Sequence, residues 1–135
     1  MIDSLQFHHI GIATRNIAKT AQAYACMGFT ATTVVYDAIQ KVNICFVSKA
    51  NTPLIELVEP TESQSPINKI LDDVGTSPYH ICYQTTEMEA DIEALQEQQY
   101  VLLQRPVAAV ALDNRRICFL YNRDMGLIEL LEEVT

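Results

Sequence analysis

Two histidines and two glutamates stand at matching points of an internal repeat. His9 opens the segment HIGIAT and His80 opens HICYQT 71 residues later, while Glu56 in LIELVE recurs 73 residues later as Glu129 in LIELLE. Imidazole nitrogens and carboxylate oxygens are common ligands of divalent transition metals. The four side chains therefore predict an N2O2 metal site with open positions for water or substrate, and Zn, Ni, Co, Mn and Fe all fit.

The surroundings of the two glutamates strengthen this prediction. Each is flanked by Ile and Leu in a segment with strand character, so its carboxylate points to the face opposite its apolar neighbours and needs a partner there. A single histidine at the head of a strand is more often structural, and a single glutamate in an edge strand is more often solvated. The recurrence of both residue types favours the metal site. Glu59 and Glu132, on the opposite strand face, are expected to be solvated.

The repeat also sets the expected fold, because each copy shows the order strand, helix, strands. The linker helix is expected to begin at Pro66 and end at Gly75. The elements expected elsewhere are strands at 7–13, 30–36, 42–47 and 54–58, a helix at 17–27 between an Asn16 cap and Gly28, a strand at 79–84, a helix from the capping box Thr86–Glu89 to Gln99, and strands at 101–103, 116–121 and 127–132. This predicts an α+β fold of two tandem βαβββ modules packed around a shared metal-binding cleft, with module one at about 5–60, the linker helix at 61–77 and module two at about 78–134.

The amino-acid composition limits the classes of binding partner that are expected. The chain has 135 residues, 49% of them hydrophobic, and a net charge of −8, which favours a folded domain and argues against nucleic acid or anionic membrane partners. The longest purely apolar stretch, 107–112, is too short to span a membrane, and the first residues carry no basic segment, so a cytoplasmic protein is expected. The four cysteines are expected to be buried, reduced thiols.

The motifs of the chain resemble those of the vicinal oxygen chelate superfamily, most closely its methylmalonyl-CoA epimerase and glyoxalase I branch. The resemblance covers 7–132 and rests on HIGIA at 9–13, IELVEP at 55–60, SPI at 65–67, HICY at 80–83, ICFL at 117–120 and LIEL at 127–130. It implies that His9, Glu56, His80 and Glu129 bind one divalent metal ion. It also implies a homodimer.

The family's chemistry implies an isomerase, epimerase or lyase. A substrate with two adjacent oxygens, such as an acyl-CoA or a hemithioacetal, would bind the metal, which stabilises the enolate formed when a carboxylate removes the α-proton. Epimerases of the family carry a base glutamate where this chain has Ile39. Asp37, two residues away, or Glu129, as both ligand and base, is therefore the expected base.

Two other functions remain open. An extradiol dioxygenase is disfavoured by the second glutamate, and a metal-free binding protein of the drug-resistance type is disfavoured because all four ligand types are present. A cleft that serves an anionic substrate in an acidic protein needs local positive charge and hydrogen-bond donors. The candidate substrate contacts are Tyr36, Lys41, Arg105, Arg115 and Tyr121.

Overall fold

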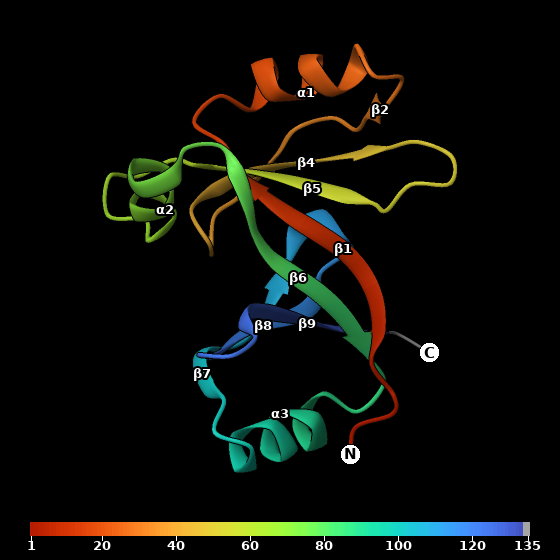
Figure 1. Cartoon of the computed structure of the whole chain (residues 1–135), viewed down its shortest axis with the longest axis vertical. Helices are drawn as coiled ribbons and strands as arrows, with labels where there is room; N and C mark the ends of the chain where they lie inside the picture. Colours follow the sequence, from red (N-terminus) through yellow and green to blue (C-terminus); the bar gives the residue numbers. More distant parts are fainter. Residues whose placement is uncertain (134–135) are drawn as a thin grey trace. The chain divides into compact units, whose positions relative to one another are not determined.

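The computed structural model describes residues 1–133 and divides the chain into two compact units (Figure 1). One unit is formed by residues 9–79. The other is formed by residues 1–8 together with the chain from His80 onward. Each unit contains one copy of the sequence repeat. Among the described residues, no helix is both long and apolar enough to cross a membrane.

The unit of residues 9–79 is a small sheet with one helix on one face. Strand β1 (Gln6–Ala13), of which His9 onward belongs here, runs parallel to β5 (Ile55–Pro60). The strand order is β2 (Thr30–Ala31), β4 (Val42–Ser48), β5, β1, and β3 (Val35–Asp37) also pairs with β4. Helix α1 (Ile17–Ala25) packs on the sheet through Ile17, and the buried sheet residues there are Ile12, Cys45, Val47 and Leu57. The linker helix α2 (Ile67–Val74) completes the unit and ends at Gly75, whose φ is 75°.

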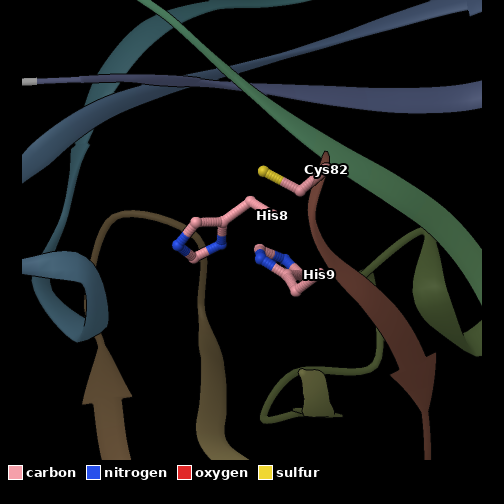
Figure 2. A group of neighbouring side chains, drawn as sticks. All are labelled: His8, His9 and Cys82. Carbon is pink, nitrogen blue, oxygen red and sulfur yellow. The ribbon is translucent and has the colours of Figure 1, made fainter. Parts of the chain in front are cut away.

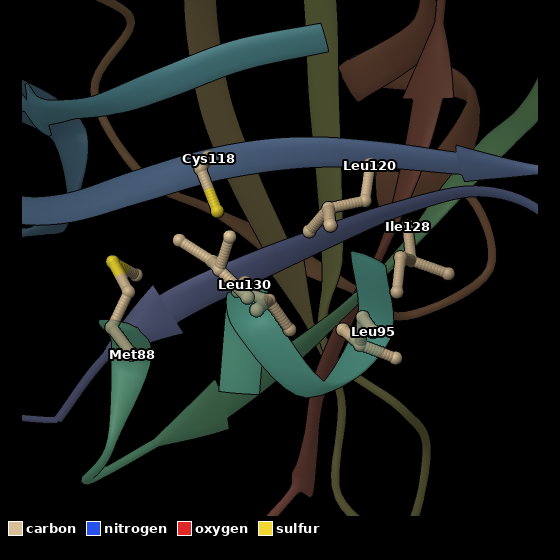
Figure 3. Packing of buried hydrophobic residues seen from close by; sticks show 7 residues of the cluster. Met88, Leu95, Cys118, Leu120, Ile128 and Leu130 are labelled. Carbon is tan, nitrogen blue, oxygen red and sulfur yellow. The ribbon is translucent and has the colours of Figure 1, made fainter. Parts of the chain in front are cut away.

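The other unit repeats this arrangement. Strand β6 (Ser77–Thr85), from His80 onward, runs parallel to β9 (Gly126–Glu132), followed across the sheet by β8 (Arg115–Asn122) and β7 (Val101–Ala109). Between β7 and β8 lies a short 3₁₀ turn, η1 (Val110–Leu112). Helix α3 (Met88–Glu97) covers one face. Figure 3 shows the core beneath it, formed by Met88, Ile92, Leu95, Cys118, Leu120, Ile128 and Leu130.

The α+β fold and the βαβββ order of each copy are confirmed. The equivalence extends to hydrogen bonds at the strand–helix junctions: the Thr14 hydroxyl accepts the amide of Asn16, and the Thr85 hydroxyl accepts the amide of Glu87. The two hydrogen bonds join equivalent residues of the two copies, which are 71 positions apart in the sequence. They hold the chain at the point where it turns from strand into helix.

Some local predictions were wrong for identifiable reasons. The strand expected at 30–36 is interrupted, so that β2 and β3 pair separately with β4. The expected capping box of α3 does not form, because Thr85 rather than Thr86 receives the junction amide and Glu87 is the N-cap residue. Strand β7 is longer than predicted because it follows β8 through two irregularities in register. Cys26 is exposed, whereas the other three thiols are buried, and none of the four cysteines, all of which lie in the described part of the chain, forms a disulfide.

Glu59 and Glu132 are not solvated as expected. Glu59 accepts the amide of Ile17 at 2.9 Å, at the start of α1, and the side-chain amide of Asn43 at 2.8 Å. Glu132 accepts from Arg116, the residue that corresponds to Asn43 in the repeat, with Nε–Oε1 at 3.0 Å. These carboxylates therefore tie the helix-bearing face of each sheet together. A strand pattern alone did not reveal this because the partners are distant in sequence.

We predict that Asn16→Ala destabilises the protein by about 1 kcal/mol, because the Asn16 side chain accepts the amide of Lys19 and satisfies an otherwise unbonded helix donor. Urea unfolding measures the change. The matched control is Glu87→Ala, at the N-cap of α3, where no side-chain cap bond exists. An equal loss in the control would contradict the assignment.

We also predict a pH-dependent effect of Glu132→Gln. The hydrogen bond from Arg116 lowers the pKa of Glu132, so the charged carboxylate stabilises the folded state above the unfolded pKa of about 4.3. This stabilisation is lost as the pH falls through the lower, folded pKa. The variant should therefore be less stable than the parent at neutral pH and equally stable in strong acid. Unfolding curves across this pH range, with Glu97→Gln on the exposed side of α3 as control, test the prediction.

Candidate functional site

The unit of residues 9–79 holds His9 and Glu56 against each other. Gly11 pairs with Glu56 between the parallel strands β1 and β5, so His9, two residues earlier on the same strand face, reaches the glutamate. The His9 Nε2 lies 3.4 Å from Glu56 Oε1, and both side chains are buried. The ring of Phe46, which pairs with Glu56 across β4 and β5, meets the His9 ring edge-on at 5.6 Å between centroids.

The other unit builds the same arrangement from different residues. Cys82 pairs with Glu129 between β6 and β9, which places His80 on the same face. The His80 Nε2 lies 3.1 Å from Glu129 Oε1, and both side chains are buried. Phe119 pairs with Glu129 across β8 and β9 and meets the His80 ring edge-on at 5.4 Å.

Each unit therefore presents a half-site: a histidine, a glutamate and a supporting phenylalanine on the sheet face opposite the helix. Sequence reasoning did not assign a role to Phe46 or Phe119. The signal was the recurring ICF block, which contains them. Because Phe46 and Phe119 fix the imidazole planes from the side, they act as positioning residues for the half-sites.

The buried carboxylates affect the thiols near them. Burial is the main cause that raises the pKa of Cys45, and the negative charge of Glu56 adds to it. Burial likewise raises the pKa of Cys118 to about 12, with a further contribution from Glu129. Both thiols are therefore protonated at neutral pH. Burying a carboxylate costs free energy unless a cation or hydrogen-bond donors compensate it, and in each unit an imidazole lies next to the buried carboxylate.

Figure 2 shows the histidine pair of β1 together with Cys82 of β6. His8 and His9 are consecutive, so their side chains leave the strand in different directions. His9 is fully buried and His8 is half-buried. Only His9 enters the half-site with Glu56.

Asp37, a candidate base, lies in the hairpin between β3 and β4. One carboxylate oxygen accepts the amides of Ile39 and Gln40, each at 2.9 Å, and the other accepts the Gln40 side chain at 2.9 Å. The side chain is 1% exposed. These three bonds give Asp37 a turn-holding role, and a role as base stays a prediction.

The candidate substrate contacts fall into two groups. Arg115 and Tyr121 lie on β8 at an even spacing from Phe119, so they share the face of Glu129. Tyr36, by contrast, pairs with Asn43 and lies on the α1 face of its sheet. Lys41 is exposed in the turn between β3 and β4, and Arg105 is exposed in the part of β7 where the register is irregular. The structure therefore brings Arg115 and Tyr121 to a half-site face, and all five substrate contacts stay predictions.

Several known proteins are similar to this chain. The uncharacterized protein YqjC of Bacillus subtilis (strain 168) is 30% identical over 129 residues, covering 92% of this chain and 89% of that protein. A hypothetical protein of Bacillus halodurans C-125 has a similar structure, with a TM-score of 0.84, 26% identity and coverage of 98% and 97%.

Methylmalonyl-CoA epimerases are also among the similar structures. The Mycobacterium tuberculosis enzyme matches with a TM-score of 0.85 at 23% identity, covering 100% of this chain and 93% of that one. A variant of the Streptomyces coelicolor enzyme, in complex with 2-nitronate-propionyl-CoA, matches with a TM-score of 0.83 at 25% identity, covering 98% and 97%.

A sequence profile assigns the family directly. It matches residues 8–119, which include five of the six half-site residues, all but Glu129. The match agrees with the two βαβββ copies and with the His–Glu pair in each. The chain belongs to the Glyoxalase/Bleomycin resistance protein/Dioxygenase superfamily.

Proposed function

We propose that this protein is a divalent-metal-dependent enzyme of the epimerase, isomerase or lyase type, with His9, Glu56, His80 and Glu129 as the metal ligands. The observation that carries the proposal is the duplicated half-site: two buried His–Glu pairs, with nitrogen–oxygen distances of 3.4 and 3.1 Å, each supported by one phenylalanine. Packing alone does not explain why both copies of the repeat bury a carboxylate against an imidazole. One shared cation would compensate all four side chains.

The four side chains fit such an ion by their chemistry. Two neutral nitrogens and two carboxylate oxygens suit Zn, Ni, Co, Mn or Fe, and leave positions for two further oxygens. When bound, the ion would polarise a substrate carbonyl and so acidify the neighbouring carbon. This is the chemistry needed for proton transfer next to a thioester or 2-hydroxy carbonyl group.

Within this proposal, Glu129 is the base that takes and returns the proton. Both half-site carboxylates are buried, but the face of Glu129 also carries Arg115 and Tyr121, which could hold the anionic part of a substrate. Asp37 is engaged by three donors of its own turn. A substrate of the acyl-CoA class is supported by the epimerase structures, one of which was solved in complex with methylmalonyl-CoA.

Elemental analysis of the full chain, purified without added metal or chelator, tests the proposal. We expect about one transition-metal equivalent per chain, and incorporation of solvent deuterium into an acyl-CoA or hemithioacetal probe by the metal-loaded protein. Absence of metal even after incubation with Co, Ni or Zn would refute the enzyme function. It would favour the second candidate, a metal-free binding protein of the drug-resistance type, since the superfamily description also names a bleomycin resistance protein.

A further inference from the structure

Gln104 lies on a half-site face, although sequence reasoning gave it no role. On the neighbouring strands β7, β8 and β9 (Figure 1), Gln104 pairs with Phe119, and Phe119 pairs with Glu129. Residues that pair directly on antiparallel strands point to the same face, so the three side chains form one row across the sheet. Because adjacent strands are about 4.8 Å apart, the Cα atoms of Gln104 and Glu129 are separated by about 10 Å, with Phe119 between them.

The equivalent position of the other copy is used differently. There, Thr32 lies opposite Phe46, and its hydroxyl accepts the Phe46 amide at 2.9 Å, so its side chain holds the sheet together. Gln104 instead stands between two shifts of register, one after Leu102 and one before Val107. Such irregularities often turn a side chain toward a functional site. Gln104 is half-buried, and no hydrogen bond joins its carboxamide to another of residues 1–133.

A carboxamide at this place suits a substrate that carries an amide. Its N–H groups donate and its oxygen accepts, so it can bond to both polar groups of a secondary amide. The carrier arm of a CoA thioester has such an amide a few bonds beyond the sulfur. If the α-carbon of the acyl group lies at Glu129, the arm can cross Phe119 and bring this amide to Gln104.

We propose that Gln104 is a substrate-binding residue, which forms hydrogen bonds to the amide in the carrier arm of a thioester. This inference rests on the proposed function, because it takes the reacting carbon to lie at Glu129. It adds that the enzyme selects its substrates by the arm as well as by the acyl group. A thioester whose arm lacks the amide would leave the Gln104 carboxamide without this partner.

The test compares two propionyl thioesters as probes. The thioester of N-acetylcysteamine has the amide, and the thioester of pentanethiol has an arm of matching length without it. Gln104→Met keeps the size of the side chain and removes its hydrogen bonds. In the metal-loaded full chain, this variant should lower kcat/KM for solvent-deuterium incorporation by about 3- to 10-fold with the amide probe and leave it unchanged with the pentyl probe. Equal effects on both probes, or no effect on either, would overturn the proposal.

Calorimetric binding of propionyl-CoA separates this inference from the proposed function. Gln104→Met and Gln104→Ala should each weaken binding by about 3- to 10-fold. Gln96→Ala, at an exposed glutamine of α3, should leave it unchanged, and circular dichroism verifies that each variant folds. If the parent binds propionyl-CoA but exchanges no deuterium, the enzyme function fails alone, and weaker binding by the Gln104 variants still supports the contact. A parent that does not bind propionyl-CoA, or Gln104 variants that bind it as tightly as the parent, would overturn the contact itself.

Discussion

Glu129→Gln is expected to slow solvent-deuterium exchange into the substrate by about 10²- to 10⁴-fold, the usual contribution of a general base. Glutamine keeps the size of the side chain and an oxygen that can bind metal, but it accepts no proton. The bound metal should therefore be largely retained while proton transfer is lost. Metal content and isotope exchange, measured on the same preparation, check both parts of the expectation.

Two matched variants give this prediction its specificity. Glu132→Gln changes a carboxylate three residues along the same strand, which is bonded to Arg116 on the other face of the sheet, and should leave exchange unchanged. Glu56→Gln changes the equivalent residue of the other half-site, which we assign as a ligand only. If Glu56→Gln abolished exchange and Glu129→Gln did not, the roles of the two glutamates would be reversed.

The half-sites were predictable from sequence because strand geometry is regular. Alternation along a strand fixes which residues share a face, so a repeat that places His9 and Glu56 on adjacent strands also places His80 and Glu129 in the same relation. The recurring order of three blocks then gave the βαβββ order of each copy. No knowledge of distant contacts was needed for either conclusion.

The parts that sequence did not reveal depend on partners far along the chain or on competition between neighbours. Glu59 resembles a solvated strand residue until helix α1 brings the amide of Ile17 to it. Asp37 stands near the position expected for a base, but the amides of its own turn converge on it. At the start of α3, Thr85 and Thr86 are adjacent hydroxyls, and only the fold determines that Thr85 receives the junction amide.

The second large effect concerns how many ions the two half-sites hold. If one ion is shared, as we propose, His9→Ala and His80→Ala should each weaken the binding of that single ion by at least about 100-fold. Each variant removes a direct ligand, and even a residue that only hydrogen-bonds to a ligand typically contributes 10- to 100-fold to metal affinity. If the half-sites bound separate ions, the parent would hold two equivalents, and each variant would lose one and keep the other at unchanged affinity. Titration with Co²⁺, followed by calorimetry, distinguishes the two cases.

The shared-ion prediction also has a signature in stability. An ion that binds only the folded chain adds stability in proportion to the logarithm of its concentration relative to its dissociation constant. The parent should therefore unfold at a higher temperature as Co²⁺ is added, whereas both histidine variants should show little change. Lys19→Ala, at an exposed residue of α1, is the control and should respond like the parent. If Co²⁺ raised the unfolding temperature of either histidine variant as much as that of the parent, a single ion held by both half-sites would be contradicted.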